Sequence, residues 1–151
     1  MAITQAMATS FKVEILDAYH NFGTAPTRAT GAADTFKIAL YTSSATLDST
    51  TTAYTTSGEV ASGGGYTTGG NTLTISNVPN SATGTTAWLS FSNTTWSTAT
   101  ITANGAMIYN STQGNRAVAI LAFGGDKTST SGDFTIVFPT ANNTSAIIRI
   151  A

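Results

Sequence analysis

Threonine is the feature that most restricts how this chain can fold. It makes up about a fifth of the residues and is spread along almost the whole length. Because its side chain branches at Cβ, threonine favours extended strands over helices. Apolar residues fall in short runs separated by Gly, Asn, Ser and Pro, which favour turns. The sequence therefore predicts a mainly β protein.

The spacing of the strand-like segments favours two packed sheets. Eight or nine short strands in about 120 residues, with turn residues between them, are typical of a β-sandwich. We expect a jelly-roll-like antiparallel β-sandwich with one N-terminal α-helix. The predicted organisation is an N-terminal helical arm (1–23), a linker (24–33) and a β-sandwich domain (34–151). The strand segments are 34–42, 71–78, 85–92, 98–103, 105–111, 116–123, 133–138 and 145–150.

Several local patterns make this prediction specific. In 34–42, Phe36, Ile38 and Leu40 alternate with less apolar positions, as in a strand buried on one face. The dipeptide Asn104-Gly105 is a strong hairpin signal and predicts a tight turn between two paired strands. The glycines at 124 and 125 predict the end of the following strand, and the polar stretch 43–54 predicts a long loop.

The single predicted helix lies near the N-terminus and is amphipathic. Apolar residues recur there at helical spacing, with charged residues between them on the predicted opposite face. The apolar positions are Phe11, Ile15, Ala18, Tyr19 and Phe22, and the charged positions are Lys12, Glu14 and Asp17. Such a stripe must be buried either on the chain's own sandwich or on a neighbouring chain. The sequence leaves both possibilities open.

Charge is scarce, which sets the kind of surface the protein presents. Six basic and seven acidic residues give a net charge of −1, so a nucleic acid partner is not expected. Only 9% of residues are charged, against roughly a quarter in an ordinary soluble domain. A surface of hydroxyls and amides costs less side-chain entropy and charge desolvation to bury than one of Lys and Glu. It suits protein interfaces, although it also serves simply to keep β-strands soluble.

Residues that carry chemistry are few. The chain has no cysteine, which excludes disulfides and thiolate zinc sites, and we expect no cofactor and no metal. His20 is the only histidine and is expected to serve a structural role at the helix end. A glycosidase would need two of Glu59, Asp126 and Asp133 to share a cleft. We therefore expect no enzymatic activity. Charges interrupt the apolar N-terminus, so neither a signal peptide nor a membrane span is expected.

Two tyrosines stand out because they lie in the polar, glycine-rich middle of the chain, where no core obviously needs them. These are Tyr54 and Tyr66. Together with apolar residues of the predicted helix they form the set of candidate protein-interface residues: Phe11, Ile15, Tyr19, Tyr54 and Tyr66.

An ordered series of phrases gives the sequence a resemblance to a known group. The phrases are DTFKIALYT at 34–42, GAMIYN at 105–110, NRAVA at 115–119, FGGDK at 123–127, GDFTI at 132–136 and IIRI at 147–150. This series resembles small virion structural proteins of tailed bacteriophages, and most of all the capsid decoration, or cement, proteins. These phrases are strand and turn sequences and include no catalytic motif.

The resemblance implies a structural protein that binds the major capsid protein lattice on the capsid exterior and stabilises the expanded head. It also implies self-association as a homodimer or homotrimer. Such a protein would be made in the host cytoplasm, with no nucleic acid and no membrane partner. The alternative is a tail or fibre-associated protein that contacts the host surface through Tyr54, Tyr66 and the polar loop.

Overall fold

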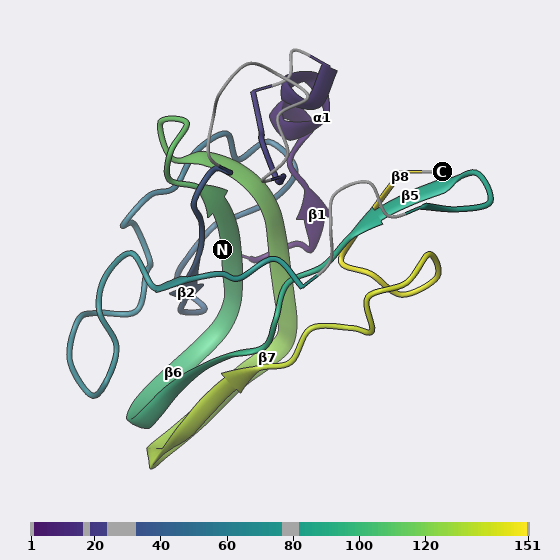
Figure 1. Ribbon diagram of the computed structural model, residues 1–151. Coiled ribbons are helices and arrows are strands. Elements are labelled where there is room, and N and C mark those ends of the chain that lie inside the picture. The colour runs from purple at the N-terminus through teal and green to yellow at the C-terminus, as the bar shows by residue number, and fades with distance from the viewer. Residues whose placement is uncertain (1, 17–18, 24–32, 77–81, 151) are drawn as a thin grey trace.

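The protein is mainly β, with two antiparallel sheets and one short helix (Figure 1). The structure is a computed structural model that describes residues 2–16, 19–23, 33–76 and 82–150. The larger sheet has the strand order β1 (Ala6–Met7), β7 (Arg116–Ile136), β6 (Thr94–Asn110), β2 (Phe36–Tyr41) and β3 (Asn71–Thr72). The smaller sheet consists of β4 (Ala82–Thr83), β5 (Thr86–Leu89) and β8 (Ile148–Ile150). The helix, α1, spans Thr9–Leu16.

The long hairpin of β6 and β7 is the framework of the larger sheet. The two strands lie side by side as a curved ribbon, from Thr94 opposite Ile136 to Asn110 opposite Arg116 (Figure 1). The turn between them places Gly114 and Asn115 at positive φ. The Asn110 side-chain oxygen accepts hydrogen bonds from two backbone N–H groups of that turn. Asparagine and glycine therefore supply both the turn conformation and its local hydrogen bonds.

This hairpin differs from the predicted one. Asn104 and Gly105 lie inside continuous β6 and form no turn, so the hairpin predicted there is wrong. Gly105 pairs with Tyr41 of β2 and with Ala122 of β7, and a Cβ added to it would lie 2.6 Å from the Leu121 carbonyl oxygen. A glycine inside a strand often marks such a close approach, and the hairpin rule does not distinguish this role from a turn.

The predicted end of the next strand is also wrong. β7 continues to Ile136 beyond Gly124 and Gly125, both at positive φ. Its pairing with β6 moves from Gly105 opposite Ala122 directly to Ala103 opposite Lys127. The extra residues of β7 are accommodated as a bulge, which a glycine pair permits without ending the strand.

β2 confirms the predicted strand at 34–42 but is more deeply buried than expected. Phe36, Ile38 and Leu40 are buried as predicted, and Ala39 and Tyr41 on the alternate positions are buried as well. The strand lies between β6 and β3, and the polar segment 43–70 packs against it, with the Val60 N–H donating to the Leu40 carbonyl and the Gly58 carbonyl accepting from the Thr42 N–H. That segment contains isolated bridges but no strand, as the loop prediction for 43–54 requires.

The N-terminal segment packs on its own domain. β1 pairs with β7, and Phe11 of α1 is fully buried in the main core. The helix ends at Leu16, so the predicted helical stripe as far as Phe22 is too long. Beyond it the chain turns inward, and the Phe22 ring stacks on Phe36 with centroids 4.3 Å apart. The linker predicted at 24–33, except Ala33, lies outside the described residues.

Gly70 provides a direct test of how loop 43–70 meets the sheet. Its φ is +66°, and a Cβ added there would lie 1.8 Å from the Ile38 carbonyl oxygen. Gly114 has nearly the same φ, +65°, with no neighbouring atom within 4 Å of an added Cβ. We expect Gly114→Ala to lower the free energy of unfolding by about 1–2 kcal/mol, the cost of left-handed backbone alone. Gly70→Ala should cost about 4 kcal/mol or more, because the steric overlap adds to it.

Urea unfolding of the two variants measures this difference. Equal losses for the two alanines would show that the loop does not pack on β2 in this way.

Candidate partner-binding surfaces

The first candidate site to consider surrounds His20, the only histidine. Its side chain is inaccessible to solvent, and Nε2 lies 2.8 Å from Glu14 Oε2. The other Glu14 oxygen accepts a hydrogen bond from Arg116, whose guanidinium lies 4.4 Å from the centre of the Tyr19 ring. Glu14 is buried, contrary to the prediction that it lies on the polar face of the helix. The Glu14 carboxylate therefore links α1 to Arg116 at the start of β7.

The hydrogen bonds around Asn110 define the tautomer of His20. Asn110 Oδ1 accepts from the backbone N–H of Thr112 and of Gln113, so its Nδ2 must face the opposite way. That nitrogen donates to Asp34 Oδ2 at 2.7 Å and to His20 Nδ1 at 3.1 Å. Because Nδ1 accepts, Nε2 carries the proton and donates it to Glu14. Both ring nitrogens are engaged within the protein, so neither is free to act on a substrate in this conformation.

The second cluster surrounds Glu59. Its carboxylate accepts hydrogen bonds from the hydroxyls of Tyr54 and Tyr66, both at 2.6 Å, and from the Gly69 N–H at 2.7 Å. The Tyr66 hydroxyl also accepts from the Leu40 N–H in β2. Tyr109 stacks on Tyr54 with ring centroids 4.6 Å apart. A single carboxylate thus holds three positions of the polar segment together, and the Tyr66 hydroxyl links this cluster to β2.

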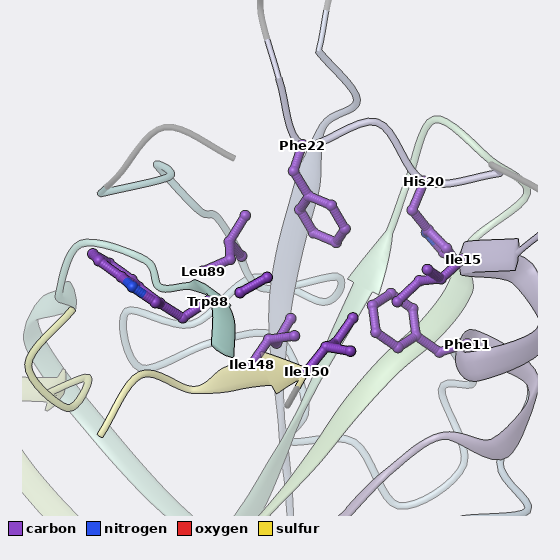
Figure 2. Close-up of a pocket in the computed structure, with 9 residues that line it drawn as sticks. Phe11, Ile15, His20, Phe22, Trp88, Leu89, Ile148 and Ile150 are labelled. Carbon is purple, nitrogen blue, oxygen red and sulfur yellow. The ribbon is translucent and has the colours of Figure 1, made fainter. Parts of the chain in front are cut away.

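A third feature is an apolar pocket between the N-terminal segment and the smaller sheet. Figure 2 shows Phe11 and Ile15 on one side, Leu89 on the other, and Ile148 and Ile150 from β8 between them. Its volume is about 160 Å³, and His20 is the one ionisable group among its lining residues. Ile150, at the rim, is 51% exposed. The pocket is therefore an uncharged, largely apolar recess open to solvent.

The predicted interface residues have different environments. Phe11 and Tyr66 are buried in the core, and the expectation that no core needs Tyr66 is wrong. Phe11 faces a partner only as part of the wall of the apolar pocket. Ile15 lines the apolar pocket. Tyr19 is 43% exposed beside Arg116, and Tyr54 is half-buried in the Glu59 cluster. The structure brings Phe11 and Ile15 together at one pocket and places Tyr54 and Tyr66 at a separate cluster.

Sequence reasoning missed the contributions of β5 and β8 to the pocket. Leu89 and Ile148 belong to strands nearly sixty positions apart that pair in the smaller sheet. Their apolar character was evident, but nothing in the local sequence indicates that they meet the N-terminal helix.

Comparison with known proteins identifies no relative. No family model matches the chain, and no curated protein or solved structure matches it at a significant level. Within the described residues, no helix combines the length and apolar character needed to cross a membrane. Among the residues that the structure describes, no three His, Asp or Glu side chains lie close enough together to hold a metal ion.

The tyrosine cluster predicts a loss of stability at alkaline pH. Burial, and then the charge of Glu59, raise the pKa of Tyr109 to about 12. Burial also raises the pKa values of Tyr41, Tyr54 and Tyr66, with Glu59 as the next cause. Above pH 10 the folded protein therefore retains protons that the unfolded chain releases. Below about pH 10 these tyrosines should not lower the free energy of unfolding. Above that pH the free energy of unfolding should fall as the pH rises.

Urea unfolding at a series of alkaline pH values, with tyrosinate absorbance recorded in parallel, tests this expectation. Glu59→Gln should lower the pKa of Tyr109, because it removes a neighbouring negative charge. Ionisation of all the tyrosines near pH 10 in the folded wild-type protein would contradict the described cluster.

Proposed function

We propose that the chain is a structural protein of a bacteriophage particle, a decoration or cement protein that binds the major capsid protein lattice. It would lie on the capsid exterior, self-associate as a homodimer or homotrimer, and stabilise the expanded head. A jelly-roll-like arrangement of the two sheets belongs to the same proposal, and their antiparallel pairing supports it. The ordered phrases from 34–42 to 147–150 support the assignment to a phage particle.

The apolar pocket between α1 and β8 is the observation that carries the capsid-binding part of this proposal. Its volume of about 160 Å³ is close to that of an apolar cavity able to hold benzene, roughly 150 Å³. One bulky aliphatic or aromatic side chain of the capsid protein would fit there. Filling the pocket would also cover Ile150 without burying an exposed charge, since the only ionisable lining group is already buried. Many copies on one lattice would sum such modest contacts.

The tail or fibre alternative has weaker support in the geometry. It relied on Tyr54 and Tyr66 for contacts with host saccharides. Both hydroxyls donate to Glu59, and Tyr66 is 3% exposed, so neither presents a free hydroxyl and an open ring face. The glycosidase alternative required Glu59 in an open cleft with another acid, whereas its carboxylate is enclosed by tyrosines and a loop N–H.

Binding to capsids tests the proposal directly. Purified protein added to undecorated expanded capsids should bind and raise the temperature at which the capsids are disrupted. The Ile150→Asp variant should bind at least about tenfold more weakly, because a charge at the rim must be desolvated when the pocket is covered.

Ser43→Asp is the matched control, since it adds the same charge at an exposed position just after the C-terminal end of β2. It should bind like the wild type, and thermal unfolding should show that both variants remain folded. Absence of wild-type binding would refute the proposed function. Equal binding by the Ile150→Asp variant would refute the assignment of the pocket.

A further inference from the structure

A larger groove lies along the outer part of β7, away from the apolar pocket. Its volume is about 590 Å³, and most of its lining residues come from two stretches on either side of Ser131, which has a φ of +48°. Gln5 and Ile147 complete the lining. Leu121 and Phe123 contribute from the first stretch, and Phe134 and Phe138 from the second. All of these residues lie in the described part of the chain. The groove is therefore built mainly by β7 and the segment that follows it, with one residue each from the N-terminal and C-terminal parts of the chain.

One side chain at this groove is unusually exposed for its type. Val137 is 71% exposed, more than any other large apolar side chain among the described residues. It also belongs to the groove lining. An exposed apolar side chain that borders an apolar groove extends the apolar surface there, and such a surface suits contact with another protein.

The groove carries one charge of each sign. Lys127 and Asp133 both line it, and Lys127 has no ion-pair partner among the described residues. Asp133 uses one carboxylate oxygen to accept a long hydrogen bond, 3.3 Å, from the Thr98 N–H. A two-fold axis places the same surface on both sides of a contact. The lysine of one copy can then meet the aspartate of the other, twice over, so the surface is complementary to itself.

Strand addition along the full length of β7 is disfavoured. The β7 edge is interrupted where pairing moves from Ala122 to Lys127, and again at Ser131 with its positive φ. Bulges of this kind prevent a further strand from pairing along an edge. A second chain would therefore contact this groove mainly through side chains.

We propose that this groove binds a second copy of the chain in a two-fold dimer. Val137 of each copy lies in the groove of the other, and Lys127 of each copy faces Asp133 of the other. The inference deepens the self-association part of the proposed function and rests on it, but it does not depend on capsid binding. Stable interfaces use roughly 20–30 residues on each side, and this groove offers fewer. We expect weak self-association, with a dissociation constant in the micromolar range.

Sedimentation velocity of the purified full chain, at micromolar to submillimolar concentrations and without capsids, tests the dimer. The wild type should change from monomer to dimer as its concentration rises. Val137→Asp should raise the dissociation constant about a hundredfold, because two apolar side chains are lost per dimer. Val13→Asp is the matched control, since Val13 is 56% exposed on α1, and it should dimerise like the wild type.

A charge exchange identifies the symmetry of the contact. Lys127→Asp alone and Asp133→Lys alone should each weaken the dimer, and the double variant should restore it, since each exchanged lysine again meets an exchanged aspartate. A monomeric wild type, a trimer, or a double variant weaker than both single variants would overturn the two-fold arrangement. Because no capsid is present, a failure here is distinguishable from a failure of capsid binding, which the Ile150→Asp experiment measures.

Discussion

Hydrogen bonding to carboxylates holds the irregular parts of this protein against its sheet. Glu14 joins the N-terminal segment to β7 through His20 and Arg116. Glu59 gathers the polar segment through two tyrosines and a glycine N–H, and the hydroxyl of one of these tyrosines, Tyr66, accepts from the Leu40 N–H in β2. Asp34 accepts from Asn110 at the hairpin turn and from the Asn21 N–H. Removing any of these acids would leave buried donors without acceptors, which costs more than the net value of the bonds.

This internal use of charge explains the character of the surface. The sequence has only seven acidic residues, and the six that the structure describes all accept hydrogen bonds from within the chain: Glu14, Asp34, Asp48, Glu59, Asp126 and Asp133. Hydroxyl groups and small residues cover much of what remains exposed. Such a surface can be buried against another protein with little charge desolvation. The apolar pocket, which no acidic or basic side chain other than His20 lines, is the clearest example.

Sequence reasoning predicted the fold class because strand-forming composition is a property of the whole chain. It predicted β2 and the loop at 43–54 from local alternation and polarity. It failed where one residue type has two structural uses: Gly105 permits close approach of strands and makes no turn, and the glycines at 124 and 125 form a bulge and not a strand end. The helix was predicted too long because Phe22 faces inward to stack on Phe36, which mimics helical spacing.

The candidate sites were less predictable for a related reason. Tyr66 is separated by 26 positions from the Leu40 N–H that its hydroxyl meets, and Asn110 by 90 positions from His20. Long-range partners of this kind are decided by topology, and local patterns carry no information about them. The sequence did indicate that Phe11 and Ile15 belong to one apolar stripe. It could not show that β5 and β8 complete the pocket beside them.

The central claim is that this neutral, hydroxyl-rich domain covers a capsid lattice. Imaging of the native particle by electron cryomicroscopy, with the chain fitted into the density, tests it most directly. The account predicts density for this domain on the outer capsid surface, with the pocket between α1 and β8 occupied by a side chain of the major capsid protein. Density confined to the tail or its fibres, or a capsid-bound domain with that pocket facing solvent, would contradict it.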